Sequence, residues 1–217
     1  MQVGEPDNGN TVNIKTGLEN LDKHINNMRN MGQSVIVTLN RFSNDKEEEI
    51  VIVRQHCKEC GVGFAMNEGY MKGGEGCMEL AQLAIDTISN NPSGDIKFTY
   101  SETDSIKDKI ISVAKNVYGA SNVVFKKSAM KALERIDEWG LGNYPVCIAK
   151  TQYSLSDDAK RYGVPKDFTF TIRDLVINTG AEMIVAVAGD IMRMPGLPKH
   201  PQAERIDIED GLLVGLE

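Results

Sequence analysis

Hydrophobic residues recur every three or four positions near the start of the chain, which is the spacing of one helix face. These positions are Leu18, Leu21, Ile25 and Met28. Gly32 follows them where a C-terminal helix cap is expected. The next run, SVIVTL at 34–39, is nearly all apolar, which is typical of a strand covered on both faces. The pattern therefore predicts a helix followed by a buried strand.

The same two patterns alternate as far as Trp139. Short apolar runs indicate strands at 63–66, 96–100 and 122–125. Helical spacing indicates helices that end near positions 60, 89, 117 and 139. Strands that alternate with helices form a mostly parallel sheet with helices on both faces, because parallel strands need crossover connections. We therefore expect an α/β fold.

The pattern changes after Gly140. VCIAKT at 146–151 is typical of one more buried strand, but FTFTIRDLVI and MIVAVAGDIM are β-rich with no helix between them. They predict a hairpin or antiparallel extension, followed by a tail rich in proline. We expect three parts: a disordered or frayed segment over 1–15, an α/β domain over 16–140, and a β-rich, partly antiparallel C-terminal segment over 141–217 packed on the same unit.

Composition narrows the range of partners. The 217 residues carry 24 Lys and Arg against 31 Asp and Glu, a net charge of −7, and the basic residues are scattered. This argues against nucleic acid as a partner, since its binding needs clustered cations. No apolar run approaches the roughly 20 residues that cross a bilayer, so we expect no membrane partner. The start of the chain has no secretion signal, which favours a cytoplasmic location.

The four cysteines include one CxxC pair, Cys57 and Cys60 in HCKEC. A structural zinc site usually brings a second pair of ligands at similar spacing, and the sequence has none. We therefore expect ordinary reduced cysteines and no metal site. His24, His56 and His200 lie far apart in the sequence without a nucleophile beside them, so we interpret them as structural.

Two loops follow predicted strands and carry aromatic residues that local structure does not require. NRFSND at 40–45 contains Phe42, and NEGYMKGGEG at 67–76 contains Tyr70. Ligands gather beyond the carboxyl ends of strands in open α/β sheets, so the aromatics fit the walls of a slot for a flat heterocycle. The alternative is a tight glycine turn with aromatics covering the sheet edge. The loop is not a P-loop, because GxxxxGK[ST] is absent from the chain.

Several long stretches resemble one enzyme family. HINNMRNMGQSVIVTLNRFSNDKEEEI, EGYMKGGEGCMELA, AKTQYSLSDD and MPGLPK occur in the same order in the C-terminal part of formate–tetrahydrofolate ligase, also called formyltetrahydrofolate synthetase. The resemblance runs from about Leu18 almost to the last residue.

The resemblance implies an ATP-dependent ligase that makes formyl phosphate and passes the formyl group to N10 of tetrahydrofolate. In this family the flat folate ring lies between aromatics on two loops of the C-terminal part. Phe42 looks like one wall, Tyr70 stands where the family usually has tryptophan, and Met66 falls where an apolar residue lines the slot. The whole enzyme uses ATP with magnesium, is stimulated by monovalent cations and is an oligomer. The region 16–140 is then the folate side.

Two departures from the family matter. Tyr70 offers a smaller stacking face than tryptophan, so folate affinity or selectivity is expected to differ. The family's P-loop half is not in this sequence, so we expect an expressed fragment or a separately encoded subunit that pairs with that half and is inactive by itself. The alternative is a non-catalytic folate-binding or assembly module. No residue here is assigned a catalytic role.

Three further groups have two interpretations each. Lys72, with Gly73 and Gly74, is a possible contact for an anion or substrate, although a lysine beside glycines is more often solvated. Asp157 and Asp158 in SLSDD are better explained as turn residues that bond to nearby backbone N–H groups. The role of Lys150, at the end of a predicted strand, stays open.

Overall fold

The computed structural model of the chain describes residues 11–189, 191, 199–209 and 212–215. The helices are α1 Thr11–Asn30, α2 Glu47–Glu59, α3 Gly69–Lys72, α4 Met78–Asn90, α5 Ile106–Asn116 and α6 Lys127–Glu138, with 3-10 turns η1 Gly73–Cys77 and η2 Gln202–Glu204. The strands are β1 Ile36–Asn40, β2 Gly63–Asn67, β3 Asn122–Phe125, β4 Val146–Ala149, β5 Thr169–Asn178, β6 Met183–Ala188, β7 Asp207–Glu209 and β8 Leu212–Val214.

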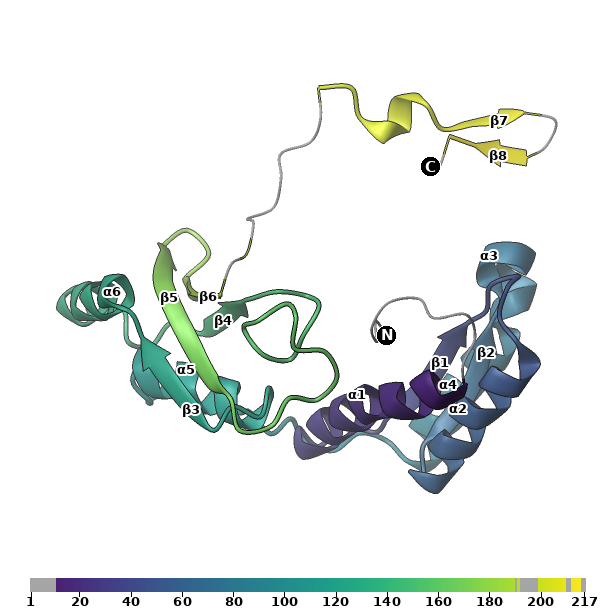
Figure 1. The fold of residues 1–217 in the computed structure, drawn as a ribbon, viewed down its shortest axis with the longest axis horizontal. Helices are drawn as coiled ribbons and strands as arrows, with labels where there is room; N and C mark the ends of the chain where they lie inside the picture. The colour runs from purple at the N-terminus through teal and green to yellow at the C-terminus, as the bar shows by residue number, and fades with distance from the viewer. Residues whose placement is uncertain (1–10, 190, 192–198, 210–211, 216–217) are drawn as a thin grey trace.

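The first sheet consists of β1 and β2, paired in parallel through the crossover helix α2 (Figure 1). On one side, Val37 and Phe64 pack with α1 and α2 around buried Leu18, Val53 and Cys57. On the other side α4 lies so close that a Cβ at Gly63 would come within 2.8 Å of the Leu83 side chain. Helices therefore cover both faces of this sheet, as the sequence pattern predicts.

The second sheet has four strands in the order β3-β5-β6-β4 (Figure 1). β3 pairs with β5 and β4 pairs with β6 in parallel, whereas β5 and β6 form an antiparallel hairpin between them. Alternate residues of β5 and β6 face one core, which also contains the apolar faces of α5 and α6. The α/β fold with antiparallel strands near its C-terminal end is thus confirmed.

The expected strand at 96–100 is wrong. This segment has no strand pairing. Its Lys97 N–H donates to the Met31 carbonyl at 3.0 Å, and its Thr99 carbonyl accepts from Ser112 Oγ at 2.5 Å. Phe98 stays 80% exposed. Alternating apolar residues form a strand only where a neighbouring strand accepts their hydrogen bonds, and this segment pairs with none of the described strands.

The ends of the chain bear on two other expectations. α1 begins at Thr11, inside the segment expected to fray, and residues 1–10 lie outside the described residues. The proline-rich tail falls mostly on 192–198, which also lie outside them. Beyond it, β7 and β8 form a short antiparallel hairpin.

The two sheets have separate apolar cores, and α1 joins them. Asn27 on α1 donates from Nδ2 to the Val117 carbonyl at 3.0 Å, and Lys23 Nζ donates to the Asn116 carbonyl at 3.3 Å. Both carbonyls lie at the end of α5, which packs against the second sheet. The second sheet takes β3 from before residue 140 and its other strands from after it. The expected domain boundaries stay predictions.

None of the helices within the described parts of the chain is both long enough and apolar enough to span a membrane.

Candidate functional site

The carboxyl ends of β1 and β2 bring the two aromatic loops to one edge of the first sheet. Their parallel register aligns Asn40 with Asn67, and Asn67 Nδ2 donates to Asn40 Oδ1 at 2.9 Å. The Arg41 N–H donates to the Asn67 carbonyl at 2.9 Å, which extends the pairing one residue beyond β1. The loops that carry Phe42 and Tyr70 therefore start side by side (Figure 1).

A tight turn fixes the first loop. The Phe42 N–H donates to Asp45 Oδ2 at 2.8 Å, and the Asp45 N–H donates back to the Phe42 carbonyl at 3.1 Å. Arg41 forms an ion pair with Glu47 at 3.1 Å, at the start of α2. With this local bonding, the Phe42 side chain is 59% exposed to solvent beyond the sheet edge.

Hydrogen bonds between its two ends close the second loop. The Glu68 N–H donates to the Gly76 carbonyl at 3.0 Å, and Asn67 Oδ1 accepts from the Gly69 N–H at 2.9 Å and from Cys77 Sγ at 3.3 Å. A Cβ at Gly76 would lie 2.5 Å from the Glu68 carbonyl, so only glycine fits there. Tyr70, on α3, is 78% exposed above this closed loop.

Met66 differs from the two aromatics because its side chain is only 9% exposed. It stands one residue before the end of β2, in register with Leu39. Its backbone N–H donates to Glu79 Oε2 of α4 at 3.4 Å. The structure thus brings the elements carrying Phe42, Met66 and Tyr70 to one sheet edge, with Met66 within the layer beneath. The slot itself stays a prediction.

Lys72 is paired within its own helix. Its Nζ donates to Glu68 Oε2 at 2.7 Å, and this bond holds the pKa of Glu68 below its ordinary value. A Cβ at Gly73 or Gly74 would meet nothing within 4 Å, so that backbone is open to solvent. An anion contact at Lys72 would have to compete with Glu68, and this role stays a prediction.

A hollow of about 620 Å3 lies between α1 and the segment after β4. Lys150 and Tyr118 line it together with His24 of α1. Lys150 Nζ donates to the Thr151 carbonyl at 2.9 Å and to the Ser154 carbonyl, and lies 4.9 Å from the centre of the Tyr118 ring. Burial lowers the pKa of Lys150 and raises that of Tyr118. These contacts explain Lys150 as a residue that orders the following loop.

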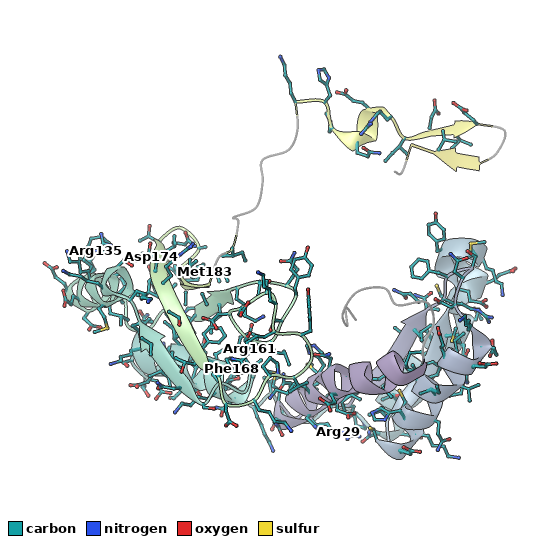
Figure 2. The ribbon with its side chains drawn as sticks, viewed as in Figure 1. Arg29, Arg135, Arg161, Phe168, Asp174 and Met183 are labelled. Atoms are coloured by element: carbon teal, nitrogen blue, oxygen red, sulfur yellow. The ribbon has the colours of Figure 1, made fainter. Side chains whose placement is uncertain are left out.

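In the SLSDD loop, Asp158 acts as the turn residue that the sequence predicts, whereas Asp157 bonds to the more distant strand β5. Asp157 Oδ2 accepts from the Thr171 N–H at 3.0 Å, and Asp158 Oδ1 accepts from the Lys160 N–H at 2.9 Å. The buried Ser154 and Ser156 hydroxyls bond to each other at 2.9 Å. Figure 2 shows Arg161 of this loop beside Phe168, with the guanidinium 5.8 Å from the ring centre.

Comparison with known proteins gives the family. The family model described as formate–tetrahydrofolate ligase matches residues 2–217. The chain belongs to this family. It is 55% identical to the formate–tetrahydrofolate ligase of Parabacteroides distasonis over 215 residues, and 53% identical to that of Bacteroides thetaiotaomicron over 215 residues. It is 50% identical to that of Campylobacter concisus over 205 residues. The resemblance seen in the sequence is therefore confirmed.

The matches cover 99%, 99% and 94% of this chain, but only 38%, 38% and 37% of the three formate–tetrahydrofolate ligases. The chain thus spans less than two fifths of the length of these relatives.

Neither the sequence motifs nor the resemblance to formate–tetrahydrofolate ligases predicted the hollow beside Lys150. Its walls come from α1 and from a segment about 130 residues later, which no local motif connects. The signal that was present is the lysine at the end of β4, since ligand sites in α/β sheets begin at carboxyl ends of strands.

Proposed function

We propose that this chain is the folate-binding part of a formate–tetrahydrofolate ligase, with Phe42 and Tyr70 as the two walls of the folate slot. Met66 forms the apolar floor, and the backbone at Gly73 and Gly74 leaves room for a polar group of the ligand. Family membership supports the enzyme class. The placement of the two loops supports the assignment of the slot.

One observation carries the proposal. Parallel pairing of β1 with β2 starts both loops at the same sheet edge, and each presents a mostly exposed aromatic ring there. Single exposed aromatics are common on protein surfaces, so the support comes from two such rings on loops that leave the same sheet edge, where a flat ligand could stack on both. Both loops are also held by internal hydrogen bonds, so a ligand would meet a largely formed site.

The contribution of this part to catalysis is positioning. Folate held between the two rings presents N10 to formyl phosphate, and a fixed orientation of this kind lowers a barrier by about 7–11 kcal/mol in favourable cases. ATP and magnesium belong to a P-loop part of the enzyme outside this chain, since GxxxxGK[ST] is absent from this sequence. The chain alone is then inactive as a ligase. Its proposed location is the cytoplasm.

An apolar stripe on α4 supports a further protein partner. Met78, Ile85 and Ile88 lie on one helix face and are mostly exposed. Phe98 and Ile96 add exposed apolar surface in the segment that follows α4. We assign this surface to contact with the rest of the ligase polypeptide, which in the relatives makes up more than half of the length. Association of such units into a homo-oligomer is part of the same proposal.

Calorimetric titration of the chain with tetrahydrofolate tests the slot. The wild type is expected to bind, and Phe42→Ala or Tyr70→Ala to weaken binding by roughly two- to tenfold beyond the effect of lost contact area. Phe98→Ala is the matched control, because it removes an exposed aromatic that belongs to neither loop.

Equal affinity in the wild type and in Phe42→Ala would contradict the proposed slot. The same conclusion follows if Phe98→Ala weakens binding as much as the two loop variants. Mixing the chain with a P-loop partner and assaying product that depends on ATP, formate and tetrahydrofolate separates a catalytic part from a binding module.

A further inference from the structure

Three side chains of metal-ligand type converge between α1 and α2. His56 Nε2 lies 2.6 Å from Asp22 Oδ1, and Cys60 Sγ lies 3.4 Å from the same oxygen. Cys60 Sγ is 3.5 Å from His56 Nε2. Within the part of the chain that the structure describes, these are the residues whose ligand atoms group closely enough for an ion, all within 4.8 Å of one another.

Helix geometry explains why they meet. His56 and Cys60 are four residues apart on α2, which places both on one face of that helix. Asp22 is four residues after Leu18 on α1, and Leu18 packs against Val53 in the core between the helices. The three polar groups therefore extend the apolar contact between α1 and α2 by about one turn.

Contacts from α1 and from the core fix the position of Cys60. Arg29, labelled at the end of α1 in Figure 2, donates from its guanidinium to the Cys60 carbonyl at 2.7 Å and to the Gly61 carbonyl at 3.1 Å. Cys57, one turn before Cys60, is fully buried in the core. The His56 and Asp22 side chains are 21% and 38% exposed, so an ion can reach them from solvent.

We propose that Asp22, His56 and Cys60 form a three-ligand site for a divalent zinc-type ion, with a fourth position open to water. Ligands about 2.0–2.3 Å from a tetrahedral ion lie roughly 3.3–3.8 Å apart, and two of the three separations are already in that range. The short contact between His56 and Asp22 must lengthen by less than about 1 Å when an ion replaces the shared proton.

The donor set selects the type of ion. One thiolate, one imidazole nitrogen and one carboxylate match zinc, whereas magnesium and calcium prefer oxygen alone. A thiolate and a carboxylate together also balance the charge of a divalent ion. From the sequence we expected no metal site, because no second pair of ligands accompanies the CxxC pair and the histidines were interpreted as structural. The structure instead combines Cys60 with a histidine on its own helix and an aspartate on α1. This proposal is independent of the folate slot.

Cobalt and zinc titrations of the metal-free chain test the site. Cobalt bound to a thiolate gives a charge-transfer absorption band, so the wild type is expected to show this band at one ion per chain and to lose it when zinc is added. Cys60→Ser should lose the band, and Asp22→Asn should weaken binding by at least about tenfold. Cys147→Ser, which alters an exposed cysteine on β4, should match the wild type.

Zinc should also raise the melting temperature of the wild type and of Cys147→Ser but not of Cys60→Ser, because metal binding is coupled to folding. The proposal is overturned if the wild type gives no thiolate band, or if the band persists in Cys60→Ser. Loss of the band in Cys147→Ser would place the ion elsewhere and overturn it as well.

Discussion

Lys150 carries its charge in a partly buried place. Two carbonyls and the Tyr118 ring surround its ammonium, and the charge of Asp157 favours the protonated form, but burial outweighs these effects and lowers its pKa. Between this lowered value and the ordinary lysine value, the unfolded chain binds more protons than the folded chain. The free energy of unfolding contributed by Lys150 therefore rises with pH across that interval.

We predict that Lys150→Met flattens this alkaline rise. Urea unfolding at a series of alkaline pH values should give a steeper increase in unfolding free energy for the wild type than for the variant. Lys131→Met, which changes an exposed lysine on α6, should keep the slope of the wild type. Parallel curves for the wild type and Lys150→Met would show that burial of this ammonium has no net effect.

How far residues could be predicted from the sequence depended on whether their motif is local. Phe42 and Tyr70 follow directly after their strands, so a strand pattern and a family resemblance were sufficient to select them. Asp22 and His56 are 34 positions apart and meet only because α1 packs on α2. The spacing of His56 and Cys60 could be read from HCKEC, but the crossing of two helices depends on their whole apolar faces, so the aspartate from α1 had no signature in the sequence.

At the scale of elements, the loop from Glu68 to Cys77 depends on one glycine more than on its neighbours. A Cβ at Gly76 would lie 2.5 Å from the backbone of Glu68 and 2.9 Å from the Gly69 nitrogen, and backbone atoms cannot move aside cheaply. A Cβ at Gly74 would meet nothing within 4 Å. The two positions therefore allow a controlled comparison of the same substitution within one loop.

We predict that Gly76→Ala lowers the free energy of unfolding by about 1–3 kcal/mol, the usual cost of forcing an extra methyl group into occupied space. Gly74→Ala should change it by no more than about 0.5 kcal/mol. Urea unfolding of both variants measures the difference. If both cost the same, the close approach of the Glu68 backbone does not restrict the residue at position 76.

A local apolar pattern was not sufficient to predict strands, because a strand also needs a partner strand to pair with. NVVF at 122–125 forms β3 by pairing in parallel with β5, whereas IKFTY at 96–100, which also alternates apolar residues, pairs with no described strand. The apolar pattern of a segment shows which side chains can be buried, but the strand with which it pairs lies elsewhere in the chain. Helices, whose hydrogen bonds are internal, were predicted more closely: α4 ends at Asn90, against about 89 from the sequence.

At the scale of the whole molecule, two apolar cores imply two regions of separate stability. Ile136 is fully buried in the core of the second sheet, and Val53 is buried in the core between α1 and α2. The sequence did not predict this division, because strands of both sheets share one alternating pattern with the helices. Only the pairing of β3 and β4 with the β5-β6 hairpin separates them from β1 and β2.

We predict that Ile136→Ala, which should cost about 2–5 kcal/mol, reduces amide protection in β5 and β6 and leaves β1 and β2 near their wild-type protection. Val53→Ala should reduce amide protection in β1 and β2 and leave β5 and β6 near their wild-type protection, with a smaller loss than Ile136→Ala. Hydrogen exchange read by mass spectrometry on peptides from each sheet makes the comparison. Equal loss of protection in both sheets for either variant would indicate one cooperative unit.

The insertion of the β5-β6 hairpin between β3 and β4 has a consequence for how the polypeptide matures. During synthesis, β3 and β4 leave the ribosome before their partner strands. β3 has no partner until β5, which ends at Asn178, has followed, and β4 has none until β6, which ends at Ala188. The first sheet has both of its strands by Asn67 and can assemble much earlier. The first sheet is therefore expected to fold during translation. β3 and β4 are expected to stay unpaired, with their apolar faces accessible to chaperones, until the hairpin strands have been synthesised.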